Sequence, residues 1–199
     1  MQMTIESTHL NGLVVLRPEV FEDDRGFFLE AYRKDQFLAL GLPGDYVQLN
    51  HSRSVKGVVR GLHFQWDPPM GKLMRVTRGA AFLVAVDIRK GSPTLGQWVG
   101  MEVSEESKRQ IWAPYGLARG FCALTDDCEV QYKCTGIYNP QKESGIHFAD
   151  PAIGVRWPID IKTAITSEKD RNAQSLEEWL ASPLSEHISY EPKIAAREA

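Results

Sequence analysis

The chain has 199 residues, of which 43% are hydrophobic and 25% charged, so it is long enough to bury one sizeable core. The formal net charge of -3 argues against a nucleic-acid partner, because proteins that follow a phosphate backbone usually carry a basic surplus. The first residues lack the apolar core of a signal peptide, and no window approaches about 18 consecutive apolar residues. We therefore expect a cytoplasmic protein without a membrane segment.

Short apolar or alternating runs, separated by glycine, proline and charge, follow one another from about residue 12 to residue 158. This spacing is typical of antiparallel strands in a sandwich or barrel. We expect ten strands, at residues 12–18, 27–32, 46–52, 57–64, 72–79, 81–89, 96–103, 109–116, 118–124 and 129–138. The pattern predicts an all-β jelly roll, an antiparallel β-sandwich or barrel with a few short helices.

Two short helices are expected. One covers about residues 34–40, and the other begins at Ser175, which has Glu178 three residues later in the spacing of a capping box. We expect one domain over residues 1–186 and a loosely ordered C-terminal tail over residues 187–199, because the chain becomes polar there.

The three cysteines, Cys122, Cys128 and Cys134, include no CxxC pair and lie in apolar or strand-like stretches. Neither a zinc site nor a disulfide framework is indicated by this spacing. We interpret them as reduced thiols in the core.

Cofactor motifs are missing. The chain has neither GxGxxG nor GxxxxGK[ST], which disfavours nicotinamide chemistry and phosphoryl transfer. Jelly-roll metal sites often use two histidines one residue apart on a strand, whereas this chain has His63 and then Gln65, and its other histidines are scattered. We predict that no metal is bound.

His63 stands on an expected strand between Arg60 and Gln65. An imidazole with a near-neutral pKa can take a proton from a carbon next to a ketone. A core histidine that donates to a carbonyl explains the same pattern, so the strand alone leaves both interpretations open.

Tyr132 shares one face of its expected strand with Val130 and Cys134, so it points into the sandwich. It is either a structural phenol or a general acid on the face opposite the base. Lys72 follows a turn and is either solvated or a donor to an enolate oxygen or a phosphate. Arg25 and Arg60 are likewise either solvated or ligand-binding, since a guanidinium can form bidentate hydrogen bonds with a diphosphate.

Taken together, these segments resemble the family of dTDP-4-dehydrorhamnose 3,5-epimerases from about Gly12 to Asp170. The motifs occur in order and at the family's spacing. They are Asp24-Arg25-Gly26 with Glu30, Gln48-Leu49-Asn50, Gly57 to His63, Gly91-Ser92-Pro93-Thr94, Tyr138-Asn139-Pro140, Asp150-Pro151 and Trp157-Pro158.

The resemblance implies a cupin-like jelly-roll homodimer that needs no cofactor. It implies that His63 is the base, oriented by Asp170, and that Tyr132 is the acid. It further implies that Lys72 and Arg60 flank the sugar and its enolate and that Tyr138 stacks on the nucleobase. The residues that would contact the nucleotide or the sugar are Arg25, Glu30, Gln48, Asn50, Glu143 and Lys169.

The implied reaction inverts C3 and C5 of dTDP-4-dehydro-6-deoxy-D-glucose and gives dTDP-4-dehydro-L-rhamnose. Both carbons lie next to the C4 carbonyl, so each hydrogen can leave as a proton and return on the other face through an enolate. No electron is transferred, which agrees with the missing dinucleotide motif.

Two positions depart from the family pattern. The family usually has histidine where this chain has Arg119 and aspartate where it has Leu83. We expect Arg119 to bind the sugar carbonyl or a phosphate, altering substrate preference or the number of centres inverted, unless it only repeats the histidine's role in a subfamily. The alternatives are a mono-epimerase, an epimerase of another nucleotide-linked 4-keto-6-deoxy sugar or heptose, a metal-dependent cupin enzyme, and a non-catalytic sugar-binding module.

Overall fold

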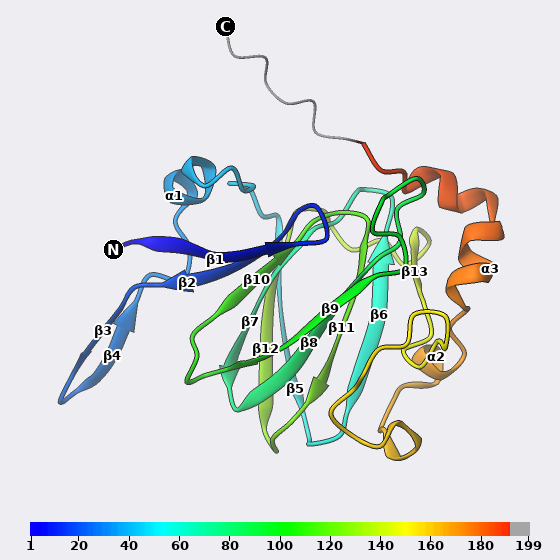
Figure 1. Cartoon of the computed structure of the whole chain (residues 1–199). Coiled ribbons are helices and arrows are strands. Elements are labelled where there is room, and N and C mark those ends of the chain that lie inside the picture. The colour runs from blue at the N-terminus through cyan, green and yellow to red at the C-terminus, as the bar shows by residue number, and fades with distance from the viewer. Residues whose placement is uncertain (192–199) are drawn as a thin grey trace, which may run out of the picture.

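The computed structural model describes residues 1–191, and its strands form two antiparallel sheets that face each other (Figure 1). One sheet has the order β1 (Met3–His9), β2 (Leu13–Pro18), β10 (Gln110–Ala113), β7 (Lys72–Arg78), β12 (Cys128–Cys134) and β5 (Gln48–Ser54). The other has the order β13 (Glu143–Gly145), β6 (Val59–Gln65), β11 (Leu117–Ala123), β8 (Ala80–Asp87) and β9 (Trp98–Ser104). The predicted all-β sandwich is confirmed.

The remaining elements lie outside the two sheets. A separate hairpin consists of β3 (Val20–Asp23) and β4 (Gly26–Leu29) and projects away from the sandwich (Figure 1). The helices are α1 (Lys34–Ala39), α2 (Glu168–Arg171) and α3 (Leu176–Ala181), with 3-10 turns η1 (Ile161–Thr163) and η2 (Pro183–His187). Both expected helices are confirmed.

Three strands and one helix were not predicted from the sequence. Strands β1, β3 and β13 are short or polar, so neither an apolar run nor a clear alternation marks them in the sequence. Helix α2 has four residues, too few for a 3.6-residue period to show. The strand expected over residues 129–138 ends at Cys134, and the rest forms a loop.

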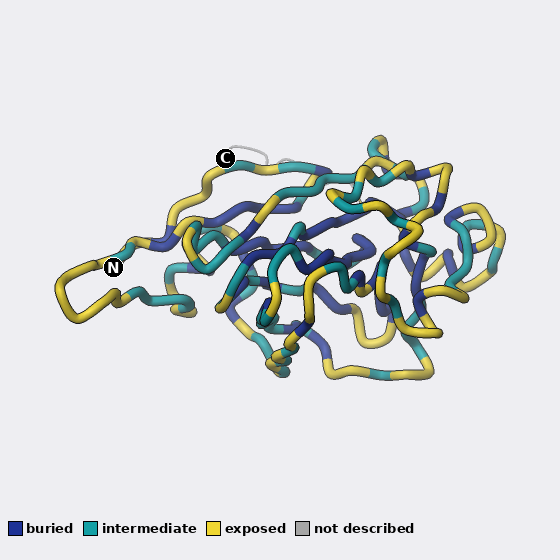
Figure 2. The backbone as a smooth tube through the Cα atoms, turned by 90° about the horizontal axis from the view of Figure 1, so that it is seen from below, coloured by how far each residue is buried: buried dark blue, intermediate teal, exposed yellow. Residues whose placement is uncertain are grey.

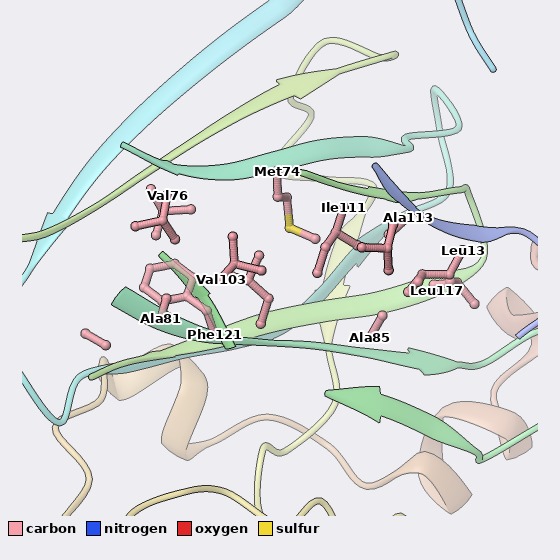
Figure 3. Packing of buried hydrophobic residues seen from close by; sticks show 14 of the residues in the cluster. Leu13, Met74, Val76, Ala81, Ala85, Val103, Ile111, Ala113, Leu117 and Phe121 are labelled. Carbon is pink, nitrogen blue, oxygen red and sulfur yellow. The ribbon is translucent and has the colours of Figure 1, made fainter. Parts of the chain in front are cut away.

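The core lies between the inner faces of the two sheets (Figure 3). It contains side chains from both, among them Met74, Val76 and Val130 from one sheet and Leu83 and Phe121 from the other. Buried residues run along the strands and exposed ones gather in the loops (Figure 2). Burial of this apolar surface is the main stabilising contribution to the fold.

The outward face of β6 packs under α3. Phe64 and Trp179 are both buried, and their ring centroids are 4.6 Å apart. Since successive side chains of a strand point to opposite faces, burial of Leu62 and Phe64 beneath α3 turns His63 and Gln65 toward the other sheet.

The start of α3 is fixed by two groups of hydrogen bonds. Ser175 and Glu178 form the capping box that the sequence predicts. The buried carboxylate of Asp150 accepts from the backbone N–H of Leu176 at 2.6 Å and of Ala152 at 2.8 Å. The Asp150-Pro151 motif therefore anchors the helix.

A second motif is also structural. The side chain of Asp87, which is fully buried at the end of β8, accepts hydrogen bonds from Arg89, Ser92 and Thr94. These bonds outweigh the burial that would raise the pKa of Asp87, so its pKa is lowered. The Gly91 to Thr94 turn is thus tied to the sheet.

The C-terminal residues pack on the sandwich as far as Tyr190. Ile188 is fully buried, and the N–H of Tyr190 donates to the carbonyl of Lys90 at 2.8 Å. The beginning of the predicted tail therefore packs against the domain, and residues 192–199 lie outside the described residues. Within residues 1–191, no helix is both long and apolar enough to cross a membrane.

The three cysteines are free thiols and all are buried, as expected. Burial raises the pKa of Cys122 and of Cys128 to about 11. They therefore remain neutral and pack as small apolar side chains.

Candidate active site

A cavity of about 410 Å³ opens between the two sheets. The six-stranded sheet contributes Gln48, Asn50, Lys72 and Tyr132, and the five-stranded sheet contributes His63, Phe64, Gln65, Arg119 and Glu143. Met70, Tyr138 and Lys169 complete the lining from two loops and α2. Most of the predicted site residues, although distant in sequence, therefore meet in one place.

A second cavity of about 150 Å³ adjoins the first. His63, Lys72, Arg119 and Tyr132 line both cavities, so these four side chains lie at their junction. Arg60 lines the second cavity, where its Nε donates to the hydroxyl of Ser54 at 3.1 Å. The junction combines one imidazole, two cations and one phenol.

His63 is bonded to Asp170. Nε2 of His63 and Oδ1 of Asp170 are 2.5 Å apart, although the residues are 107 positions apart in sequence. Asp170 is held at the start of α2, where its N–H donates to the N-cap side chain of Ser167. An Nε2–H that donates to Asp170 leaves the lone pair of the neutral imidazole on Nδ1, which can then accept a proton.

Asp170 remains ionised despite its burial. Burial by itself raises the pKa of this carboxyl, but hydrogen bonds from His63, Ser167 and the backbone of Gly61 outweigh it and lower the pKa below its ordinary value. A permanent carboxylate at Nε2 orients the ring and stabilises the imidazolium that forms when His63 takes a proton.

Tyr132 and Lys72 face His63 from the opposite sheet. Nζ of Lys72 lies 4.9 Å from the centroid of the Tyr132 ring. Burial, and then the charge of Arg119, lower the pKa of Lys72 to about 8. A proton acceptor and a phenolic donor thus lie on opposed walls, and the ammonium beside the phenol can stabilise developing negative charge.

Strands β6 and β11 approach closely behind this junction. His63 pairs with Arg119 in the register, and a β-bulge separates Arg119 from Phe121. A Cβ on Gly61 would lie 2.6 Å from the Cα of Gly120, so only glycine allows the backbones to come together here. Their direct pairing places His63 and Arg119 side by side in the cavity wall.

The rim of the cavity carries a connected polar cluster. The hydroxyl of Tyr138 donates to Oε2 of Glu143 at 3.1 Å, and Nζ of Lys169 contacts the same oxygen at 2.5 Å. Oε1 of Gln48 accepts from the N–H of Tyr138 at 2.8 Å, and Nε2 of Gln48 donates to Asn50 at 2.9 Å. The exposed ring of Tyr138 is held at the entrance, where a planar ligand can stack on it.

Gln65 has a positioning role that the sequence interpretation did not assign. Its buried amide donates to the carbonyls of Pro68 and Ile137 and accepts from the N–H of Asn139 at 2.8 Å. It fixes the loop that presents Tyr138. A polar residue on the same strand face as His63 is the sequence feature that points to Gln65.

Two predicted binding residues do not reach the cavity of their own chain. Arg25 lies in the turn of the β3–β4 hairpin and pairs with Asp23 at 2.5 Å. Glu30 follows the hairpin and lies 3.4 Å from Arg33. Leu83, by contrast, is buried in the core beside the junction, opposite Phe121 in the register.

A metal-dependent cupin enzyme and a non-catalytic sugar-binding module would each arrange the side chains of this cavity differently. Among residues 1–191, no three His, Cys, Asp or Glu side chains gather as metal ligands would. A binding module has no need to hold His63, Asp170 and Tyr132 together, whereas here His63 is bonded to Asp170 and shares the cavity with Tyr132. The arrangement favours proton-transfer chemistry.

The chain is similar to known proteins over most of its length. The model of the dTDP-4-dehydrorhamnose 3,5-epimerase family matches residues 7–178. A protein of that name from Methanothermobacter thermautotrophicus is 49% identical over 86% of this chain and 93% of its own. The crystal structure of a dTDP-6-deoxy-D-glucose-3,5-epimerase from Legionella pneumophila, in complex with dTDP-4-keto-L-rhamnose, is 42% identical, with a TM-score of 0.89 over 96% of this chain and 100% of its own.

A relative named for a narrower activity is also similar. The dTDP-4-dehydrorhamnose 3-epimerase of Streptomyces niveus is 39% identical over 88% of this chain and 85% of its own. The chain is therefore similar in sequence both to enzymes named as 3,5-epimerases and to one named as a 3-epimerase.

Proposed function

The chain belongs to the dTDP-4-dehydrorhamnose 3,5-epimerase family, and from that premise we propose how its jelly-roll cavity performs the reaction. The protein is an isomerase that inverts C3 and C5 of dTDP-4-dehydro-6-deoxy-D-glucose. The observation that carries our mechanism is the His63–Asp170 pair, which faces Tyr132 across a cavity lined by Lys72.

Proton abstraction begins at His63. Its Nδ1 takes the proton from the carbon next to the C4 carbonyl, and the electron pair of the C–H bond moves into the enolate, whose negative charge is on the C4 oxygen. Asp170 stabilises the resulting imidazolium, and the ammonium of Lys72 stabilises the enolate. The free-energy barrier falls because both charges meet a fixed opposite charge.

Inversion is completed from the other wall. The hydroxyl of Tyr132 gives its proton to the opposite face of the same carbon, and the electron pair of the enolate forms the new C–H bond. His63 and Tyr132 then return to their starting states by exchanging a proton with solvent. The same two proton transfers at the second carbon account for the second inversion.

The nucleotide occupies the rim in this proposal. Tyr138 stacks on the base, and Gln48, Asn50, Glu143 and Lys169 bind the nucleotide or the sugar. Arg60, which lines the smaller cavity, flanks the sugar from the far side. The exposed rim thus provides affinity, and the buried junction provides chemistry.

A homodimer accounts for Arg25 and Glu30. The hairpin that carries Arg25 exposes Phe21, Phe27 and Phe28, and exposed apolar surface of this kind marks an interaction site. We propose that the hairpin packs on a second copy and brings Arg25 to that copy's nucleotide. Mixing the inactive variants Arg25→Ala and His63→Ala tests this, because mixed dimers regain one intact site only if Arg25 acts across the interface.

A cytoplasmic location and the lack of a nucleic-acid partner stay predictions from the sequence. Cell fractionation and a binding assay with duplex DNA test them. Recovery with the membrane fraction, or binding to DNA at physiological salt, would contradict them.

Hydrogen exchange tests the central proposal. The protein is incubated in D2O with dTDP-4-dehydro-6-deoxyglucose, and deuterium at C3 and C5 is followed by NMR. Deuterium at both carbons, lost in His63→Ala, is the expected result. Absence of exchange with wild-type protein would overturn the proposal for this substrate.

A mono-epimerase is the second candidate, and the departures at Arg119 and Leu83 are the observation that favours it. In this case deuterium enters one carbon only. The same NMR experiment separates the two candidates, since the C3 and C5 signals are resolved individually.

A further inference from the structure

We propose that Arg119 binds the C4 oxygen of the keto sugar and, together with Lys72, holds the negative charge of the enolate as a second fixed cation. The inference rests on the proposed function and assigns to Arg119 one of the two roles that the sequence left open, the carbonyl instead of a phosphate.

The position of Arg119 supports contact with the sugar. Arg119 lines both cavities, pairs with His63 in the register of β6 and β11, and is only 3% exposed. The nucleotide-binding candidates Tyr138 and Lys169 are exposed at the rim. A group at the depth of His63 meets the reacting sugar and not the diphosphate.

The guanidinium of Arg119 is incompletely satisfied. Nη1 donates to the carbonyl of Met70 at 2.7 Å, and within residues 1–191 the buried Nε has no partner. No carboxylate of these residues is among the groups that raise its pKa, which are the thiol of Cys134 and the phenol of Tyr132, and its other charged neighbour is the cation Lys72. A buried cation with an unpaired donor is costly in free energy, so an anionic or strongly polar oxygen of a ligand would stabilise it.

Leu83 leaves this charge free to act on a ligand. In the register of β8 and β11, Arg119 lies opposite Ala85, and Leu83 is its diagonal neighbour on the same inner face. The buried leucine supplies no carboxylate that would pair with Arg119. The guanidinium donors that do not bond to Met70 therefore stay available to the cavity.

The C4 oxygen is the group of the substrate that fits. Removal of a proton from C3 or from C5 places the negative charge on this same oxygen, so one cation site serves both inversions. Preorganised donors around such an oxygen stabilise it most strongly as the charge develops. Lys72 and Arg119 line the same junction, and burial lowers the pKa of Arg119 only to about 10, so Arg119 keeps its charge where Lys72 loses its own.

Substitution of Arg119 by methionine tests the proposal. We expect deuterium exchange at both C3 and C5 to slow by about 10²- to 10³-fold, the usual loss for one oxyanion donor. Affinity for dTDP, which has no sugar carbonyl, should stay within about twofold of the wild-type value, as expected for a group that acts only on the reacting centre. Arg75→Met is the matched control, because Arg75 also has a buried Nε without a partner in the described part of the chain but lies outside both cavities.

Chemical rescue guards against a merely structural loss. In Arg119→Ala, free guanidinium at a concentration below that of unfolding should restore exchange, whereas urea at the same concentration should not. Leu83→Asp should also slow exchange, because a carboxylate beside Arg119 would neutralise its charge. A thermal unfolding curve of each variant shows whether it is folded.

Three outcomes would overturn the proposal. Exchange at the wild-type rate in Arg119→Met excludes a role at the C4 oxygen. A parallel loss of dTDP affinity assigns Arg119 to the diphosphate, and failure of guanidinium rescue in a folded Arg119→Ala excludes a charge-based role. Absence of exchange in the wild-type protein would instead overturn the proposed function itself.

Discussion

Residues 1–191 contain two histidine–carboxylate pairs, of which one faces the cavity. His63 and Asp170 are 2.5 Å apart with side chains 27% and 5% exposed, whereas His51 and Glu129 are 3.0 Å apart with side chains 48% and 23% exposed. The outer pair joins β5 to β12 on the face of the sheet that points away from the cavity. A short contact between imidazole and carboxylate is therefore common to both pairs and does not by itself define a catalytic site.

The surroundings of the two carboxylates make the difference. Glu129 is shared with Arg53, whose Nε lies 3.7 Å from it, and water screens this surface cluster. Asp170 is buried, bonded to the N-cap of its own helix, and directed at a ring that lies opposite Tyr132 and beside Lys72. Catalysis requires the pair, the opposed acid and the cation together, and only the inner pair has all three.

The largest expected effect separates the two histidines. His63→Ala should slow deuterium exchange at C3 and C5 by about 10⁴-fold, at the upper end of what a general base contributes, because the other three side chains described at the junction are two cations and a phenol. Binding of dTDP should remain, since His63 acts on the sugar. NMR exchange rates and calorimetry measure the two quantities. His51→Ala is the control, and a comparable loss there would break the comparison.

Tyr132→Phe tests the opposed acid, which the outer pair lacks. We expect product formation to fall by about 10²- to 10³-fold, while exchange at the first centre falls less, because abstraction by His63 does not need the phenol. Parallel NMR measurement of product and of deuterium at each carbon checks this. An equal loss in both rates would contradict the assignment of separate roles.

Matched amide substitutions compare the two carboxylates directly. Asp170→Asn should slow exchange, because the ring of His63 loses the carboxylate that orients it and stabilises its charged form. Glu129→Gln removes the corresponding charge from the outer pair and should leave exchange unchanged. Steady-state kinetics of both variants measure the contrast. An unchanged rate in Asp170→Asn would show that His63 does not depend on its carboxylate.

The smallest expected effect is a change with pH. Because the pKa of Lys72 is about 8, its ammonium is present below that pH and is lost as the pH rises, so kcat/KM for exchange should decline above about pH 8. Arg119 keeps its charge and should prevent a complete loss. Lys72→Met should remove this decline, whereas His51→Ala should preserve it. A flat wild-type profile up to pH 10 would contradict the role of Lys72.

Local patterns in the sequence predicted what depends on neighbouring residues. Alternation in β12 placed Tyr132 on the inward face beside Val130, and the Ser175–Glu178 spacing located the start of α3. Both follow from backbone geometry that repeats over two to four residues. Strands β1 and β13 were missed because β1 is mostly polar and β13 has only three residues, so no apolar pattern marks them.

The resemblance to a family predicted residues but not their contacts. Gln65 was considered only as a failed metal ligand, and the structure shows that it fixes the loop carrying Tyr138. Arg25 and Glu30 were expected at the nucleotide, and in their own chain they lie away from the cavity. Contacts of this kind depend on how loops and hairpins fold back, which no local period records.

By itself, the sequence determined the fold class and the inward direction of Tyr132, because strand alternation and hydrophobic burial act over a few residues. Only the tertiary structure decided that Asp170 meets His63 across 107 positions and that Arg119 lies beside His63 without a carboxylate partner among residues 1–191. The physical reason is that pairing between strands and burial between sheets bring distant residues together, and these long-range contacts set the charge and hydrogen bonding of each group.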